Sequence, residues 1–257
     1  MSILCLCLNS PCGPVIYGIH GLRRVRSHSG SSCVSPLSFP YWGLIGVGLL
    51  SAYFHATLKY HSQMGDDLSM FLAVGAILHQ LLCFEASPHA QRKYTLAILG
   101  TVVPISIYHV WADELIAHQV TFAAMVFLVS RQARALIRKQ VTCEEQRKKL
   151  GRLATFGLSV GLFGFFLWNI DVHLCAYVTA GKHWMGLPWG FVLELHAWWH
   201  IFTGIGSYVG MALVEFLVTR GQGRQQPGSI AEGFVWPVKA VMVELGDMED
   251  SNGKKTR

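Results

Sequence analysis

The sequence predicts an all-α fold: a polytopic transmembrane helix bundle with six clear spans and a partial or truncated first helix. The first observation is composition, because hydrophobic residues make up 52% of the 257 residues and charged residues only 14%, against about 25% in ordinary soluble domains. The second is that the apolar residues gather in stretches close to the roughly 20 residues that a helix needs to cross a bilayer. These stretches occupy most of the chain, which favours one membrane bundle over separate soluble domains.

Six apolar stretches are long enough to cross the bilayer. In chain order they lie at 40–58, 67–85, 94–111, 115–131, 152–170 and 191–218. A weaker candidate at 1–19 contains two prolines and two glycines, which disfavour the interior of a helix. We therefore expect this part to form only a partial helix.

The loops between these stretches alternate in basic content, which supports the layout independently of hydropathy. The segment 21–39 holds three arginines, and 131–152 holds eight basic residues, whereas 112–114 holds none. The positive-inside rule then places the basic loops and the C-terminus in the cytosol. The net charge of +6 is thus explained by topology, and no nucleic-acid partner is expected. Contact of residues 131–152 with anionic membrane lipids is a secondary role.

Three regions follow from this layout. Residues 1–39 are an atypical N-terminal segment, with a remnant of the first span and a polar linker of small residues at 28–38. Residues 40–218 form the transmembrane catalytic bundle. Residues 219–257 form a cytosolic tail that we expect to be largely disordered, with a short helix or strand at 230–245.

Ionisable residues inside a membrane span are costly and usually mark function. His196 and His200 are four residues apart and therefore project from one helical face, as two imidazoles must to bind one Zn²⁺. A third ligand from another helix, for which His55 is the candidate, would leave the fourth position for water, which is the catalytic pattern. The predicted topology gathers the ionisable residues near one, non-cytosolic side: His55, Asp66, Asp67, Asp171, His196 and His200.

The remaining histidines and the cysteines receive simpler interpretations. His109 and His118 flank an acidic turn, and we expect hydrogen-bonded bundle residues there, with a minor chance of a role behind the metal ligands. The seven cysteines are scattered and predict free thiols rather than a disulfide framework.

Four motifs, in this order, resemble those of the alkaline ceramidases. They are S-x-x-x-H at 51–55, Q-x-x-D at 63–66, L-W-N-x-D at 167–171 and H-x-x-W-H-x-x-T-x-x-G-x-Y at 196–208. Asp67 stands where the family has glutamate. At greater distance the chain also resembles the adiponectin-receptor group, which shares the zinc bundle.

The resemblance implies a seven-helix membrane hydrolase that splits the amide of ceramide into a sphingoid base and a free fatty acid. Matched residue by residue, it implies that His55, His196 and His200 hold zinc. Asp66 would orient a metal-activated water, take its proton and return it to the leaving amine. Ser51 would donate a hydrogen bond to the developing oxyanion.

The resemblance also implies a place in the cell and a second metal. Ceramide and the surrounding membrane lipids would be the partners, in the endoplasmic reticulum or Golgi. The acidic N-terminal segment that binds calcium in some family members is not recognisable here, and the chain is expected to begin inside the family's first span. Two alternatives stay open: a catalytically impaired or receptor-like zinc-binding relative, and a transporter or purely structural bundle.

Overall fold

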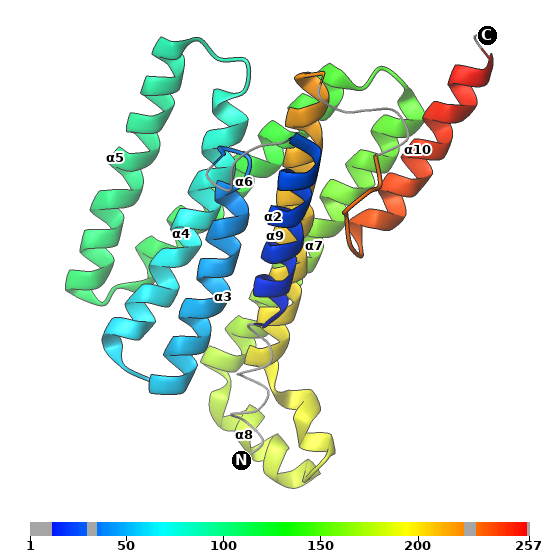
Figure 1. Ribbon diagram of the computed structural model, residues 1–257. Coiled ribbons are helices and arrows are strands. Elements are labelled where there is room, and N and C mark those ends of the chain that lie inside the picture. Colours follow the sequence, from blue (N-terminus) through cyan, green and yellow to red (C-terminus); the bar gives the residue numbers. More distant parts are fainter. Residues whose placement is uncertain (1–11, 30–34, 224–229, 256–257) are drawn as a thin grey trace.

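The structure is a computed structural model that describes residues 12–29, 35–223 and 230–255. These residues form helices joined by short turns, as Figure 1 shows. The elements are α2 (Cys12–Ser29), α3 (Phe39–Thr57), α4 (Tyr60–Cys83), α5 (Pro88–Ala112), α6 (Leu115–Gln140), α7 (Glu144–His173), α8 (Cys175–Met185), the 3₁₀ helix η1 (Trp189–Leu193), α9 (Leu195–Gly221) and α10 (Val238–Lys255). The predicted all-α class is confirmed.

Each expected span corresponds to a helix of the bundle. Within the described ranges, five helices are long and apolar enough to cross a membrane, namely α4, α5, α6, α7 and α9. The sixth expected span, 40–58, forms α3, which has 19 residues and is not among those five. The polytopic helical bundle therefore has the predicted order of elements.

The core of the bundle is built around α9. This helix contacts α2, α3, α4, α6, α7 and α10, and its side chains at Val209, Ala212, Phe216 and Leu217 are completely buried. In contrast, α5 lies at the edge of the bundle in Figure 1, with most of its surface exposed. In a bilayer such exposed apolar side chains would face lipid.

Glycines allow α7 and α9 to approach each other closely. A Cβ atom at Gly206 would lie 2.7 Å from the Gly157 carbonyl oxygen, and one at Gly157 would lie 2.7 Å from Cγ1 of Val209. Small residues at such contacts let helix backbones pack tightly in membranes. This packing holds the middle of α9 against the middle of α7.

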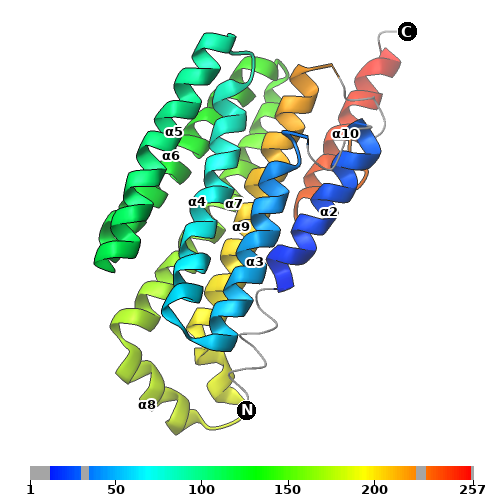
Figure 2. The same ribbon diagram turned by 60° about the vertical axis from the view of Figure 1, so that its left-hand side comes forward.

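The two ends of the bundle differ. At the lower end in Figure 1, α3 turns directly into α4 through Leu58, whose φ of 52° is left-handed. Figures 1 and 2 both show α8 extending beyond this same end. The opposite end holds the basic segment 131–152, so the charge asymmetry expected from the loops is present in the fold.

The tail differs from the largely disordered segment that we expected. Residues 238–255 form α10, and a row of apolar side chains spaced three or four apart is buried: Ile230, Phe234, Val238, Met242 and Leu245. This apolar face packs against α7 and α9, because burying it excludes water from the hydrocarbon groups. The helix or strand expected within 230–245 is present as the first part of α10, which continues to Lys255 through residues that were expected to be disordered. Residues 224–229 and 256–257 lie outside the described residues.

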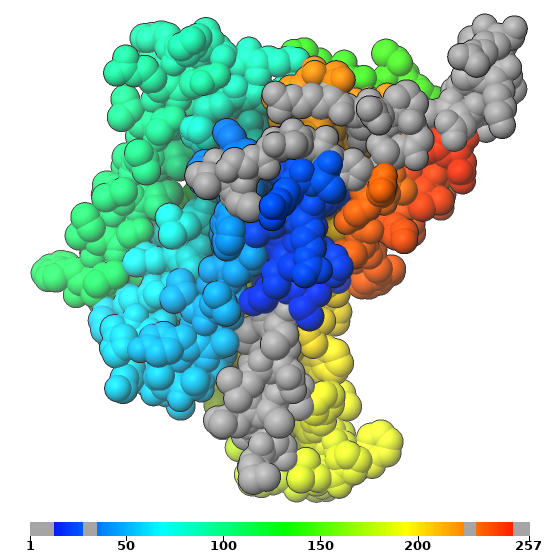
Figure 3. All heavy atoms as spheres, viewed as in Figure 1, coloured from blue at the N-terminus to red at the C-terminus, as the bar shows by residue number. Residues whose placement is uncertain are grey.

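The N-terminal segment contributes a helix, α2, that packs against α3 and α9. Figure 3 shows it at the surface, between α3 and the segment that leads into α10. The helix continues through Ser29, so the polar linker expected from residue 28 begins later than predicted. Residues 1–11 and 30–34 lie outside the described part, and the expectation for 1–19 can be compared with the structure only from residue 12 onward.

A buried ion pair joins α2 to α9. Arg24 was expected in a basic loop, but it lies within α2 and pairs with Glu215 of α9, with exposed fractions of 5% and 3%. The Tyr41 hydroxyl donates to Glu215 Oε2 at 2.5 Å, and Arg24 Nε donates to the Glu232 carbonyl at 3.0 Å. The guanidinium also lies 3.4 Å above the Phe234 ring centroid. Every charged group in this cluster therefore has close partners.

Candidate metal centre and active site

The three histidines singled out from the sequence meet at the α3–α4 end of the bundle. His55 comes from the last turn of α3, and His196 and His200 come from the first two turns of α9. One candidate ligand atom from each lies within 4.8 Å of the other two. The Nε2 atoms of His55 and His200 are 2.9 Å apart, and the ring centroids are 5.0 to 5.1 Å apart in every pair.

Local structure explains why α9 presents its histidines here. The i, i+4 spacing puts His196 and His200 on one face of the helix. Immediately before α9, Glu194 Oε2 pairs with Lys182 Nζ of α8 at 3.1 Å, which ties the connecting segment to the start of α9. His200 is buried, whereas His55 and His196 are half-buried.

The donor set fits a metal ion. Three imidazoles from two helices, with nitrogens converging on one point, are the protein ligands of many catalytic zinc sites. Asp171 Oδ2 of α7 lies 3.6 Å from His196 Nδ1, and a carboxylate at this position commonly orients a metal-binding imidazole. Within the described ranges, these three histidines are the group of His, Cys, Asp or Glu side chains close enough to share an ion.

Ser51 and Asp66 lie beside each other next to this cluster. Ser51 precedes His55 by one helical turn and is 1% exposed. Its hydroxyl neighbours the Asp66 carboxyl, yet Oγ makes no hydrogen bond of ordinary geometry to the described residues. A buried hydroxyl is costly unless it is hydrogen-bonded, and a molecule bound at the site would compete with Asp66 for the Ser51 donor.

A second polar network lies behind Asp66. The His109 ring lies between two oxygen atoms, with Nδ1 2.7 Å from the Glu114 carbonyl oxygen and Nε2 3.1 Å from Asp67 Oδ2. His118 Nε2 donates to the Asp67 carbonyl oxygen at 3.1 Å, and the two histidine rings stack with centroids 4.7 Å apart. The expectation that both are hydrogen-bonded bundle residues is confirmed.

Sequence patterns did not reveal which group these histidines bind. Asp67 is adjacent to Asp66, so the network fixes the first turns of α4 against the α5–α6 turn. The signal available was topological: His109, Glu114 and Asp67 all lie where a span ends or begins, on the side predicted to be non-cytosolic. The network makes Asp67 a positioning residue for its neighbour.

The fold and the site together define a polytopic helical membrane protein with a three-histidine candidate metal centre at one end of its bundle. The chain belongs to the ceramidase family, since residues 10–245 match the family model described as Ceramidase.

Individual relatives agree with this assignment. The chain is 31% identical over 189 residues to an alkaline ceramidase of Saccharomyces cerevisiae, covering 68% of this chain and 59% of the relative. It is 29% identical over 170 residues to alkaline ceramidase 3 of Mus musculus, covering 66% and 61%, and 24% identical over 183 residues to an alkaline ceramidase of Drosophila melanogaster, covering 70% and 59%. The chain thus spans about three fifths of the length of these relatives.

Proposed function

We propose that this chain hydrolyses the amide bond of ceramide at the centre formed by His55, His196 and His200. The observation that supports this most directly is the geometry of that centre, in which three imidazoles converge near a buried hydroxyl that neighbours a carboxyl group. Membership of the ceramidase family supplies the substrate class. The relatives named alkaline ceramidase point to the same reaction.

The reaction breaks one bond and forms another. The oxygen of a water molecule adds to the amide carbonyl carbon, and the C–N bond then breaks. One proton from the water moves to the departing nitrogen, which leaves as the amine of the sphingoid base, and the carbonyl carbon leaves as a fatty acid.

We assign the proton transfers to Asp66 and the oxyanion contact to Ser51. Asp66 would accept a proton from the attacking water and deliver it to the leaving nitrogen, a role that needs one carboxyl group within reach of both. Ser51 would donate a hydrogen bond to the carbonyl oxygen as negative charge develops there. Ser51 Oγ neighbours the Asp66 carboxyl and makes no well-formed hydrogen bond among the described residues, so a bound substrate would compete only with Asp66 for this donor.

The metal that we propose is Zn²⁺, held by His55, His196 and His200. When bound, zinc supplies Lewis-acid polarisation of a carbonyl and lowers the pKa of water toward neutrality. Asp171 would hold the His196 ring in the orientation that metal binding needs. We propose no calcium site, because the acidic segment that binds calcium in some family members is not recognisable in this sequence.

The positive-inside rule gives the orientation that we propose. The basic end of the bundle and the tail would lie in the cytosol, and the histidine centre near the opposite face of an endoplasmic reticulum or Golgi membrane. Ceramide would enter from the lipid phase, where its acyl chains remain.

The test compares His196→Ala with His173→Ala in the purified full chain. His173 is exposed near the same end of the bundle and is not in the cluster, so its removal controls for loss of an imidazole. The unmodified chain and His173→Ala should contain about one zinc per molecule and release fatty acid from ceramide at alkaline pH. His196→Ala should lose hydrolysis by roughly a thousandfold or more, because the metal contributes several kcal/mol to the transition state.

Two outcomes would contradict the proposal in different ways. Full hydrolysis by His196→Ala would remove the histidines from the reaction. Stoichiometric zinc without hydrolysis of any ceramide would instead favour a receptor-like zinc-binding relative.

A further inference from the structure

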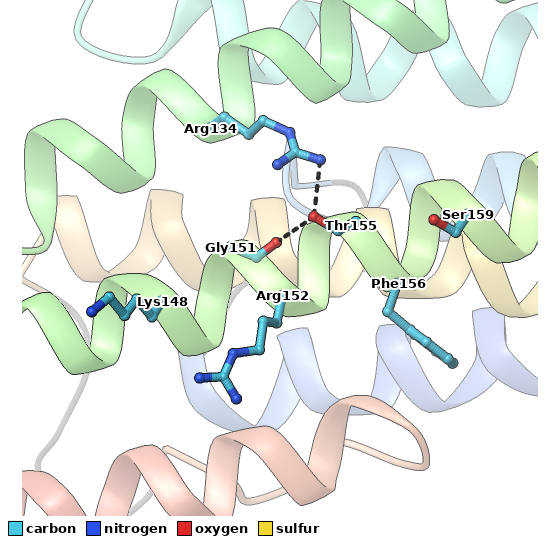
Figure 4. A pocket seen from close by; sticks show the side chains of 7 residues that line it. All are labelled: Arg134, Lys148, Gly151, Arg152, Thr155, Phe156 and Ser159. Carbon is cyan, nitrogen blue, oxygen red and sulfur yellow. Dashed lines mark hydrogen bonds between the residues drawn. The ribbon is translucent and has the colours of Figure 1, made fainter.

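A groove opens between α6 and α7, in the half of the bundle opposite the histidine centre. Figure 4 shows the side chains that line it. The groove is open to the surface and has a volume of about 570 Å³. Three of the lining residues are basic and the others are small, hydroxylated or aromatic: Arg134, Lys148, Gly151, Arg152, Thr155, Phe156 and Ser159. None of these residues takes part in the proposed hydrolysis.

The Arg134 guanidinium points from α6 toward α7 and meets hydroxyl groups. Nη2 donates to Thr155 Oγ1 at 3.3 Å and Nε donates to Ser130 Oγ at 3.4 Å. Hydroxyl groups do not neutralise a guanidinium, and no carboxylate of the described residues lies within ion-pair distance of it. Arg134 therefore has unneutralised charge at the wall of the groove.

The carboxylates near the other two basic residues are already engaged. Glu144 contacts Lys148 at 3.7 Å but pairs more closely with Arg147. Glu244 of α10 pairs with Lys149 at 2.7 Å and lies near enough to Arg152 to interact with it electrostatically. Each carboxylate is thus shared by more than one basic residue, and positive charge remains in excess.

The whole segment has the same imbalance. Residues 131–152 contain eight Lys or Arg and two Glu. That excess was assigned to membrane topology, but topology requires only that the charges lie on one side. It does not require three of them to line one groove.

Helix lengths place the groove at the depth of lipid headgroups. The 30 residues of α7 extend about 45 Å at 1.5 Å per residue, whereas the hydrocarbon core of a bilayer is about 30 Å thick. The first turns of α7 must therefore protrude from the hydrocarbon at the basic end. Lys148 and Arg152 lie on these turns, and Phe156, with 41% of its surface exposed, lies one turn deeper.

The basic side chains thus lie outside the hydrocarbon and the aromatic side chain lies deeper, an arrangement that suits a ligand with an anionic head and an apolar tail. We propose that the groove binds the phosphate headgroup of an anionic phospholipid through the basic residues of its lining, Arg134, Lys148 and Arg152, with Phe156 against the start of an acyl chain. Basic pockets between membrane helices on the cytosolic side are suited to such headgroups. The exposed Phe156 favours a lipid over free phosphate, which has no apolar part to bury.

The test measures lipid labelling of the purified full chain in phosphatidylcholine vesicles that contain photoactivatable phosphatidic acid. Labelled peptides from α6 and α7 are quantified as the mole fraction of the probe increases. Arg134→Gln and Arg152→Gln should each weaken apparent binding about fivefold, from about 1 kcal/mol per basic residue near an anionic surface. Gly151→Leu should weaken it without removing any charge, because a Cβ at Gly151 meets nothing within 4 Å and a larger side chain would occupy the groove.

Arg138→Gln is the matched control. It removes the same charge from the same segment, but Arg138 is exposed and does not line the groove, so labelling should be unchanged. Equal weakening by Arg138→Gln and Arg134→Gln would show diffuse surface attraction and overturn the proposal, as would unchanged labelling of Gly151→Leu. Displacement of the lipid by soluble glycerol phosphate at comparable concentration would overturn the lipid assignment. Thermal unfolding of each variant identifies any that fails to fold, and Gly151→Leu and the arginine variants test the groove independently of each other.

Discussion

Two polar clusters lie inside this bundle, and they differ in how completely their groups are satisfied. The Arg24–Glu215 pair is almost wholly buried, and the Tyr41 hydroxyl and the Glu232 carbonyl complete its hydrogen bonds. The histidine centre is partly accessible, its imidazoles face one another, and near it Ser51 Oγ neighbours the Asp66 carboxyl without a well-formed hydrogen bond. Polar groups that satisfy one another hold helices together, whereas groups left open are available to a metal or a substrate.

The same distinction explains where each cluster lies. A buried ion pair stabilises a fold only when the two charges pair closely and their remaining hydrogen bonds are formed. The interior beside α9 supplies these partners for Arg24 and Glu215. The histidines lie at the end of the bundle, where solvent and substrate have access. We therefore expect substitutions in the first cluster to change stability, and substitutions in the second to change chemistry.

The largest expected effect on stability comes from breaking the buried pair. Glu215→Ala should lower the free energy of unfolding by about 3–5 kcal/mol, because it leaves the Arg24 charge buried and unpaired. The double variant Arg24→Met with Glu215→Leu should recover most of that loss, since well-packed apolar residues often replace a buried pair at little cost. Thermal or denaturant unfolding in lipid measures both. If the double variant is no more stable than Glu215→Ala, the loss does not come from leaving the Arg24 charge unpaired.

A smaller effect, confined to chemistry, should follow from Asp171→Asn. The amide keeps the size of the side chain but loses the charge that faces His196 Nδ1. Loss of such an orienting partner typically lowers metal affinity about 10–100-fold, while unfolding of the metal-free protein should be unchanged. Competition with a zinc chelator reports the affinity. Unchanged affinity would remove Asp171 from the site.

The smallest effect should come from an ion pair at the surface. Lys149 and Glu244 join α7 to α10 at 2.7 Å, and the lysine lowers the pKa of the exposed Glu244 carboxyl below its ordinary value of 4.5. A lowered carboxyl pKa stabilises the fold above that ordinary value, and the contribution is lost as pH falls through the folded pKa. Because the pair is solvated, Glu244→Gln should unfold like the unmodified chain at neutral pH. A large loss of stability in Glu244→Gln at neutral pH would mean that this ion pair, rather than the buried apolar face of α10, holds α10 to the bundle.

Sequence patterns predicted the helices and the histidine centre because both depend on local spacing. Apolar stretches of spanning length produced the bundle, and the His196–His200 spacing placed two ligands on one face. The Arg24–Glu215 pair was missed because no local pattern joins residues 191 positions apart, and Arg24 was assigned to loop charge instead. The tail was predicted only in part, because a helix or strand was expected at 230–245 whereas the polar residues from 246 onward, which continue α10, were expected to be disordered. The partners of His109 depend on which loops meet at one end, which only the fold specifies.

The Arg24–Glu215 pair also has a consequence for biosynthesis. A ribosome makes Arg24 191 residues before Glu215 and makes the carbonyl of Glu232 later still, and chains are made at about 5–20 residues per second. For roughly ten to forty seconds α2 therefore contains an arginine whose final partner does not exist. The packing of α2 against α9 cannot be complete until α9 has been made, so the first described helix of this chain is among the last to reach its final place.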